Sequence, residues 1–426
     1  MFSKRNKLLK WIFFAISFAF FINISTDANA NAELREQIKE EYPTEKLIEI
    51  FLAYKKDETS LSKFFDSLQE MHIVERDLEN PEFSTVTYFA KGSTLTDYFM
   101  QSGGPDFYGL RFKQIGDSDY YYCVQRIPSN AWFNYGINEF KKISTETTAF
   151  YKTEIEHVFD GSVIGPDAPL SQNVFHNSDT RVVLEQISIE SKYMNSARDV
   201  FVYLPKTYEP DNSYNILIQL DGENFAVNAS YDEQWKGWTP LPTILDNLHS
   251  QQKITPVIAI FVLNKDRSKD LLNGAFPSFV VKEVLSTVTR KYQVEPKKVV
   301  ISGPSRAAYA AASTAFLHSE KVNGVLSQSG SFYYTLQKKE NWPIYPKFEG
   351  KILKEYMDAE TLPIDFYIDV GLYDLGLARV GTNRQFRDIL KLKGYEVEYR
   401  EYNGGHAHLN WRHSISDGLL YFFQSR

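Results

Sequence analysis

The chain has 426 residues, of which 43% are hydrophobic, 24% charged and 15% aromatic, so it has enough apolar surface for a large folded core. This length predicts more than one domain, and the composition excludes disordered, collagen-like and coiled-coil chains. A formal net charge of −7 provides no basic surface for nucleic acid, and a single cysteine, Cys123, excludes an intrachain disulfide and a cysteine-based zinc site.

Residues 1–30 have the pattern of a cleavable signal peptide. Four basic residues precede an apolar run from Trp11 to Ile22, and Ala28-Asn29-Ala30 supplies small residues at the spacing that a signal peptidase reads. The run is shorter than the roughly 20 residues of a membrane-spanning helix, and an uncleaved anchor is the alternative. We predict cleavage after Ala30, no stable membrane span after cleavage, and a periplasmic or secreted protein. Cleavage would lower the formal net charge from −7 to −10.

The pattern of apolar residues and turns changes twice in the next part of the chain. Between residues 33 and 72, apolar residues recur near helical spacing and predict a helical segment. Between residues 80 and 160, aromatic and β-branched stretches separated by glycine-containing turns predict a small β-sandwich. The stretches are Phe83–Ala90, Phe107–Ile115 and Tyr120–Ile127. Residues 161–178 have the glycine and proline content of a linker.

Residues 179–426 predict an α/β domain. A strand pair, Val182–Ser191 and Asp199–Leu204, precedes six nearly continuous apolar strands: Ile216–Leu220, Val257–Leu263, Lys298–Ser302, Gly324–Ser327, Phe366–Val370 and Val397–Tyr402. Helical patterns lie between them, at about 240–252, 277–292, 305–318, 380–393 and 412–424. Strands that are apolar on both faces and alternate with helices predict a mostly parallel sheet covered by helices.

Ser305 is the candidate nucleophile. It lies where the apolar strand ending near Ser302 turns sharply into an alanine-rich helix, in the sequence Gly303-Pro304-Ser305-Arg306-Ala307. A serine on such a strand-to-helix turn stands clear of the sheet, and the helix N-terminus faces the negative charge that develops during acyl transfer. The ordinary interpretation of this serine is a helix N-cap.

Two later turns supply a candidate base and a candidate acid. His406 follows Gly404-Gly405 after the last predicted strand, and it is preferred over His408 and His413 because it directly follows the glycine turn. Asp374 lies on the turn after the strand Phe366–Val370, where a carboxylate would orient the imidazole. Asp369, within that strand, and Asp365, before it, are the alternatives. The chain order of serine, acid and histidine is that of α/β hydrolases.

The same fold places two backbone N–H groups where they bind the oxyanion. One belongs to the residue after the nucleophile, which is Arg306. The other comes from the loop after the strand Ile216–Leu220, and we assign it to Glu223. The sequence suggests no metal site and no cofactor.

These motifs resemble the esterase group of α/β hydrolases, and within it the enterochelin (ferric enterobactin) esterases. The resemblance covers most of residues 80–426 and rests on six segments: Asn195-Ser196-Ala197-Arg198-Asp199-Val200, Leu220-Asp221-Gly222, the Ser305 turn, Leu326-Ser327-Gln328-Ser329-Gly330-Ser331, Gly404-Gly405-His406 and Trp411-Arg412. It implies a serine carboxylic-ester hydrolase with the triad Ser305, Asp374 and His406. Its implied substrate is a small-molecule ester, the lactone of a ferric catecholate siderophore.

The sequence also departs from this family. Ala307 replaces the last glycine of the nucleophile motif, Arg306 replaces an apolar residue, and the chain carries an export signal. Arg306 has two interpretations, contact with an anionic substrate or a structural ion pair. Two other functions remain open: an exported esterase of sugar-acyl or aromatic-acid esters, and a non-catalytic binding module on the same fold.

Overall fold

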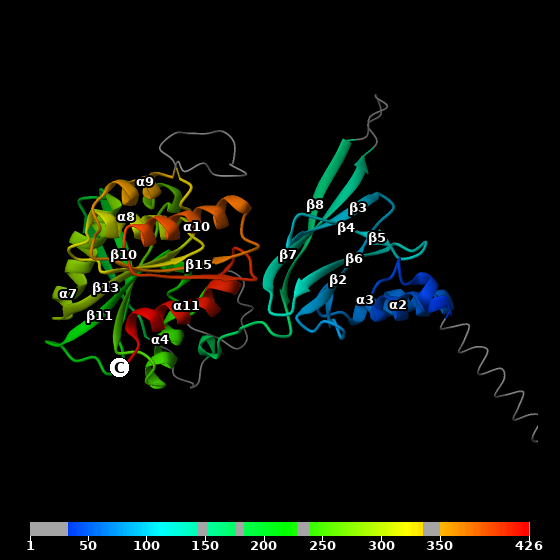
Figure 1. Cartoon of the computed structure of the whole chain (residues 1–426), viewed down its shortest axis with the longest axis horizontal. Coiled ribbons are helices and arrows are strands. Elements are labelled where there is room, and N and C mark those ends of the chain that lie inside the picture. The colour runs from blue at the N-terminus through cyan, green and yellow to red at the C-terminus, as the bar shows by residue number, and fades with distance from the viewer. Residues whose placement is uncertain (1–32, 144–151, 176–182, 228–237, 335–349, 426) are drawn as a thin grey trace, which may run out of the picture.

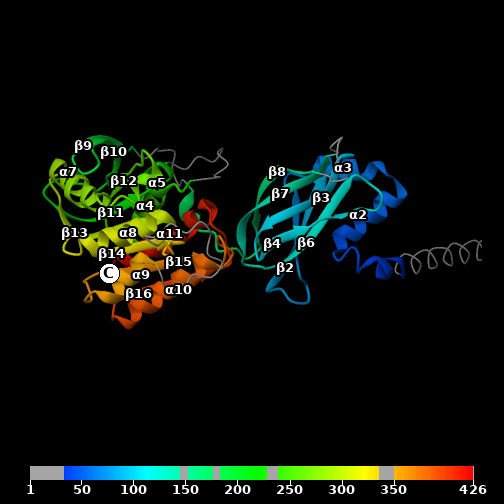
Figure 2. The ribbon, with the colours of Figure 1, turned by 90° about the horizontal axis from the view of Figure 1, so that it is seen from above.

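The computed structural model describes residues 33–143, 152–175, 183–227, 238–334 and 350–425, so the predicted signal peptide lies outside the described residues. Two parts lie side by side, as Figures 1 and 2 show from two directions. A β-rich part contains β1 to β8, and an α/β part contains β9 to β16. No helix within the described ranges is long and apolar enough to cross a membrane.

Two four-stranded sheets form the β-rich part, one in the order β1-β2-β6-β5 and the other in the order β4-β3-β7-β8. The strands are β1 (His72–Arg76), β2 (Phe83–Lys91), β3 (Thr96–Gly103), β4 (Asp106–Arg111), β5 (Lys113–Gln114), β6 (Tyr120–Pro128), β7 (Trp132–Ile143) and β8 (Lys152–Ile164). All their pairings are antiparallel. The sequence analysis missed β1, β3, β7 and β8, and it joined β4 and β5 into one strand.

Alternating side chains of β2 explain how this part is layered. Val86 and Tyr88 pack between the two sheets, while Phe89 packs on the opposite face. That opposite face is covered by α2 (Glu45–Lys56) and α3 (Thr59–Ser67), which contribute Leu47, Ile48 and Leu61 to the same cluster. Because side chains alternate across a strand, one strand serves two cores.

The α/β part is built on one eight-stranded sheet in the order β16-β15-β14-β13-β11-β12-β10-β9. The strands are β9 (Glu185–Ser191), β10 (Ser196–Tyr203), β11 (Ser213–Leu220), β12 (Val257–Val262), β13 (Glu295–Pro304), β14 (Gly324–Gln328), β15 (Asp365–Gly371) and β16 (Val397–Tyr402). β10 pairs antiparallel with β9 and β12, and all other pairs are parallel. The prediction of a mostly parallel α/β sheet is therefore confirmed.

Helices cover both faces of this sheet. One face packs against α7 (Ser286–Lys291), α8 (Arg306–Leu317), α9 (Lys351–Asp358) and α10 (Leu377–Leu392), and the other against α4 (Leu241–Ser250) and α11 (His408–Phe423). β11 again shows the alternation, because Ile216 and Ile218 face the first layer and Leu217 the second. Both faces are thus buried, as the continuous apolar strands predict.

Several segment boundaries differ from those expected from the sequence. β8 continues to Ile164, so strand structure extends into the segment predicted as a linker, which also holds the short 3₁₀ helix η1 (Gln172–Val174). The helix predicted at 277–292 is interrupted, because α6 (Phe276–Ser278) is followed by the π-helical segment η3 (Phe279–Leu285) before α7. The sequence analysis missed α9 and the short helix α5 (Arg267–Asp270).

Candidate active site

Ser305 lies on the turn between β13 and α8, and its backbone is strained. Its φ of 58° and ψ of −120° lie outside the regions that L-residues favour, and such strain persists only where neighbouring groups hold it. The Ser305 N–H donates to the carbonyl of Gln328 at 2.8 Å. A Cβ atom built on Gly303 would lie 2.6 Å from the Ala307 Cβ atom, so glycine is required at 303 for the turn to close.

Asp374 and His406 meet at the carboxyl ends of β15 and β16. His406 Nδ1 lies 2.8 Å from Asp374 Oδ1, and the Asp374 side chain is fully buried. The Leu375 N–H also donates to Asp374 Oδ1. Because one ring nitrogen of His406 faces the carboxylate, the other, Nε2, is the nitrogen that can accept a proton.

The loop that carries His406 is held by hydrogen bonds and by aromatic packing. Asn410 Oδ1 accepts the Gly405 N–H at 3.1 Å, and Asn410 Nδ2 donates to the carbonyl of Trp132 at 2.6 Å. The Trp411 indole packs edge-on against the imidazole, with 4.9 Å between the ring centroids. Trp132 belongs to β7, so the β-rich part helps to position this loop.

The electrostatics of the pair suit a base and an orienting acid at neutral pH. Burial lowers the pKa of His406, the Asp374 charge opposes this effect, and Arg379 and Arg267 lower the pKa further. Burial alone would raise the pKa of Asp374, but His406 and Arg379 more than offset it, so its pKa is below the ordinary value. His406 is therefore neutral and Asp374 ionised at pH 7.

Arg379 is a site residue that the sequence analysis missed. Its Nη1 donates to Ser305 Oγ at 3.2 Å and also contacts Ser331 Oγ, while its Nε lies 3.3 Å from Asp374 Oδ1. The side chain is only 2% exposed. One buried guanidinium thus bridges the candidate nucleophile and the candidate acid.

The contacts of Ser305 are consequently not those of an assembled triad. Within the described residues, Ser305 Oγ has hydrogen-bond partners in Arg379 and in Ser331, which is 3.3 Å away, and it has no hydrogen bond to His406. The structure brings Asp374 and His406 together and leaves the serine-histidine contact unmade. Hydrogen bonds between catalytic groups are often long without substrate, so this geometry does not exclude the assignment.

The two predicted oxyanion donors lie in helical first turns. Arg306 is the first residue of α8, where a backbone N–H has no acceptor within the helix. Glu223 lies in the short 3₁₀ helix η2 (Gly222–Asn224), which directly follows β11 and the left-handed residue Asp221. The Glu223 side chain accepts hydrogen bonds from Asn264, which fixes this loop against the end of β12.

The Arg306 side chain is not held by an ion pair within the described residues. Its Nε donates to Tyr334 Oη at 2.7 Å and its Nη1 to Ser268 Oγ at 2.6 Å. Arg267 differs, because it forms a bidentate pair with the buried Asp221. Of the two interpretations of Arg306, the structural ion pair is therefore not found in the described part of the chain.

The rival histidines have other roles. The ring of His408 packs against Trp411, and burial lowers the pKa of His408 to about 3. His413 is buried, accepts the Ser171 N–H at 3.0 Å, and has its pKa lowered by burial to about 4. Neither of these two histidines is paired with Asp374, whereas His406, which the sequence analysis preferred, is. No group of three potential metal ligands occurs among the residues that the structure describes.

The rival acids also lie elsewhere. Asp365 forms an ion pair with Lys298, with 2.8 Å between Nζ and Oδ2. Asp369 is buried within β15 and lines a cavity with residues of β16 and α11. The ion pair to His406 belongs to Asp374.

Comparison with known proteins assigns the class. Residues 191–422 match the model of the family named Putative esterase, and the chain belongs to this esterase family. The iron(III) enterobactin esterase of Dickeya dadantii (strain 3937) is 26% identical over 240 residues, which cover 54% of this chain. The chain spans about half of that curated relative, 52% of its length.

Two solved structures share the fold. Enterobactin esterase from Shigella flexneri, solved in the presence of 2,3-di-hydroxy-N-benzoyl-serine, superposes with a TM-score of 0.64 at 16% identity, over 84% of this chain and 97% of the other. Ferric enterobactin esterase from Salmonella typhimurium gives a TM-score of 0.65 at 16% identity, over 84% and 98%. The predicted resemblance to enterochelin esterases is confirmed, and the α/β esterase fold with it.

Proposed function

We propose that this esterase-family chain is a serine carboxylic-ester hydrolase in which Ser305 is the nucleophile, His406 the base and Asp374 the acid that orients the base. The observation that best supports this proposal is the 2.8 Å contact between His406 Nδ1 and the buried Asp374, at the sheet edge where Ser305 occupies its strained turn. A binding module would need none of this arrangement.

The reaction follows from these positions. Ser305 Oγ attacks the ester carbonyl while its proton passes to His406 Nε2, and the oxyanion receives the N–H groups of Glu223 and Arg306. His406 then protonates the departing alcohol, which leaves an acyl group on Ser305. Water attacks this acyl group and its proton passes to His406, which then protonates Ser305 Oγ as the acid is released, so that both residues are regenerated.

For this cycle, Ser305 Oγ must gain a contact with His406, and it can keep the hydrogen bond from Arg379. Arg379 donates to Ser305 Oγ from a fixed, buried position, so it favours negative charge on this oxygen as the proton leaves. The hydroxyl hydrogen is free to rotate toward His406, because Arg379 uses only a lone pair of the oxygen. Arg379 thus assists the step as an electrostatic partner of the nucleophile.

The charges around the site favour an anionic substrate, and the lactone of a ferric catecholate siderophore is our specific proposal. Arg379 and Arg267 both act on His406, since each lowers its pKa, and Arg306 follows the nucleophile directly. The guanidinium of Arg306 donates hydrogen bonds to two neutral hydroxyl groups, lies over the Tyr334 ring and has no ion pair within the described residues, so it can bind an anionic ligand. The relatives named above are called enterobactin esterases, which agrees with this substrate class.

A substrate panel tests the proposal. The mature chain should be assayed with ferric enterobactin, p-nitrophenyl butyrate, methyl ferulate and an acetylated sugar, each also with Ser305→Ala. We expect product from ferric enterobactin at a higher kcat/KM than from the neutral esters, and none with Ser305→Ala. Arg306→Met should raise KM for the ferric siderophore and leave KM for p-nitrophenyl butyrate unchanged.

Each other outcome assigns a different function. A preference for methyl ferulate or the acetylated sugar would replace the siderophore with an aromatic-acid or sugar-acyl ester. Saturable binding of ferric enterobactin without hydrolysis of any ester would identify a binding module and overturn the enzymatic proposal.

We also propose export with cleavage after Ala30. N-terminal sequencing of the protein recovered from the periplasm or the medium should then begin at Asn31. Recovery of the uncleaved chain from the cytosolic fraction would contradict this proposal.

A further inference from the structure

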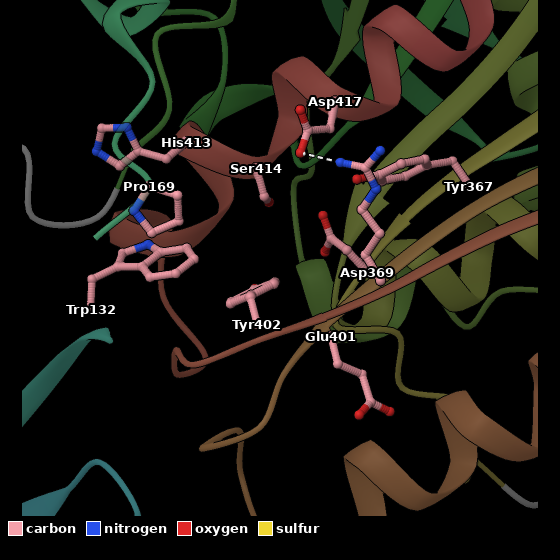
Figure 3. Close-up of a pocket in the computed structure, with 10 residues that line it drawn as sticks. Trp132, Pro169, Tyr367, Asp369, Glu401, Tyr402, His413, Ser414 and Asp417 are labelled. Carbon is pink, nitrogen blue, oxygen red and sulfur yellow. Dashed lines mark hydrogen bonds and ion pairs between the residues drawn. The ribbon is translucent and has the colours of Figure 1, made fainter. Parts of the chain in front are cut away.

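A cavity of about 190 Å³ lies where the β-rich part meets the α/β part (Figure 3), and neither Ser305, Asp374 nor His406 lines it. Trp132 of β7 and Pro169 form one side of it, and residues of β15, β16 and α11 form the rest. These residues are Tyr367, Asp369, Arg400, Glu401, Tyr402, His413, Ser414 and Asp417. Arg400 and Glu401 are exposed, so they form the solvent-facing rim.

Asp369 is the unusual member of the lining. The residue is 1% exposed, and neither of its carboxyl oxygens has a hydrogen bond of good geometry within the described residues, although the Ser414 hydroxyl and the Gln328 amide lie close enough to lower its pKa. A buried carboxyl group without partners is unfavourable, and native structures satisfy nearly all such groups with protein, water or a bound molecule. In Figure 3 the carboxyl group points toward the space between Tyr402, Ser414 and Asp417.

Three further polar atoms at the same cavity are unmatched. The indole Nε1 of Trp132 and the hydroxyl groups of Tyr367 and Tyr402 are buried and have no hydrogen-bond partner within the described residues. A single buried polar atom without a hydrogen-bond partner is common in proteins, but several of them around one cavity are typical of a site that binds a polar ligand.

The charges of the lining select the sign of that guest. Asp417 pairs with Arg400 at 2.7 Å, and Glu401 pairs with Arg384 at 2.6 Å. His413 is neutral, because burial lowers its pKa to about 4. The remaining titratable group is Asp369, which has no ion pair among the described residues and therefore favours a cation once it is ionised, above its pKa of about 7.

The shape and chemistry of the cavity select the kind of cation. The described residues provide no group of three potential metal ligands, which disfavours a metal ion. The rings of Trp132, Tyr367 and Tyr402 favour an organic cation through cation–π attraction. A volume of about 190 Å³ has room for a small organic ion, because one water needs only about 10–15 Å³ of such space.

We propose that this cavity binds a small primary ammonium ion, whose N–H groups donate to Asp369 and whose alkyl chain packs against Trp132 and Tyr402. The lining of the cavity shares no residue with Ser305, Asp374 and His406, so the proposal does not depend on the hydrolase activity. Since Trp132 also contacts the loop of His406 through its N–H and carbonyl, the guest would bind beside a segment that positions the base.

Isothermal titration calorimetry of the full chain at pH 8 with propylammonium chloride tests this site, with 1-propanol as the neutral control of similar size. We expect one saturable site for propylammonium and none for 1-propanol. Asp369→Asn should weaken binding at least tenfold. Asp365→Asn, on the same strand but outside the cavity, should leave it unchanged.

The pH dependence gives a second measurement that needs no variant. Burial raises the pKa of Asp369 to about 7, although the Ser414 hydroxyl and the Gln328 amide oppose this effect. Two nearby charges have smaller effects: Asp417 raises the pKa and Arg400 lowers it. Of the other titratable groups facing it, Tyr367 and Tyr402 stay neutral because burial raises their pKa. Propylammonium should therefore bind more weakly at pH 6 than at pH 8. Equal binding of 1-propanol, binding retained in Asp369→Asn, or no saturable binding at pH 8 would each overturn the proposal.

Discussion

Replacing Asp374 with asparagine tests the two contacts of this carboxylate, one with His406 and one with Arg379. Asp374 Oδ1 contacts both His406 Nδ1, at 2.8 Å, and Arg379 Nε, at 3.3 Å. The change removes the charge and keeps the shape. It should lower kcat about 10⁴-fold, because an amide can stabilise the wrong tautomer of His406 and cannot balance the imidazolium. KM should change little, since the lost interaction is made in the transition state.

The same change should destabilise the fold. Two unit charges 3.3 Å apart attract with about 5 kcal/mol at an effective dielectric constant of about 20. Removing one charge leaves the Arg379 guanidinium buried without its partner, and such losses are typically about 3–5 kcal/mol. Urea unfolding should therefore show a lower midpoint at pH 7, with kcat measured well below that midpoint.

The matched control is Asp365→Asn at the start of the same strand. Asp365 pairs with Lys298 at the partly exposed edge, where an ion pair contributes about 1 kcal/mol or less. This variant should retain kcat and nearly all stability. If Asp374→Asn loses less than tenfold in kcat, the orienting role of Asp374 is refuted and a serine-histidine dyad remains.

Three further predictions concern the turn and the histidines. Gly303→Ala should destabilise the chain by about 1–3 kcal/mol in urea unfolding and lower kcat, because the new Cβ atom would lie 2.6 Å from that of Ala307. The control is Gly274→Ala, because no atom lies within 4 Å of a Cβ atom at position 274. The pH profile of kcat/KM should fall on acidification with an apparent pKa below 6.5, since burial lowers the pKa of His406 and only the neutral ring accepts a proton; a midpoint above 6.5 would contradict this. The neutral, buried His413 should make the free energy of unfolding fall by about 3 kcal/mol as the pH drops from 6.5 toward 4, because its pKa is lowered to about 4 in the folded chain. Urea unfolding of His413→Asn should show a smaller decrease over the same pH range.

The α/β sheet could be predicted from the sequence because its strands are apolar on both faces and are separated by amphipathic helices. Patterns of this kind are local, and the turns after β13, β15 and β16 carry Ser305, Asp374 and His406 in fixed order. Parallel strands align their carboxyl ends at one edge, which explains why Ser305 and His406, 101 positions apart, were expected together. The structure brings the acid and the histidine into contact, as that reasoning predicts.

The strands of the β-rich part were harder to recognise. β3 and β7 mix polar and apolar residues, since one face of each is partly exposed, and β8 carries several exposed side chains. Edge position and alternation weaken the apolar signal that identified the central strands of the other sheet. The pairing of distant strands such as β3 and β7 depends on tertiary contacts that no short segment encodes.

Arg379 was missed for a different reason. An arginine in the first turn of an amphipathic helix is ordinarily a solvated residue. Its burial depends on partners from three places, Asp374, Ser305 and Ser331, which are up to 74 positions away in the chain. Only its position five residues after the candidate acid hinted at the site.

Covalent labelling of Ser305 tests the central claim most directly. A fluorophosphonate reacts quickly only with a serine that a general base activates, so the mature chain should gain one phosphonyl adduct on the peptide that contains Ser305, located by mass spectrometry. Ser305→Ala should abolish the adduct and His406→Ala should slow its formation by several orders of magnitude. An unlabelled Ser305, or an adduct that persists in Ser305→Ala, would contradict the account.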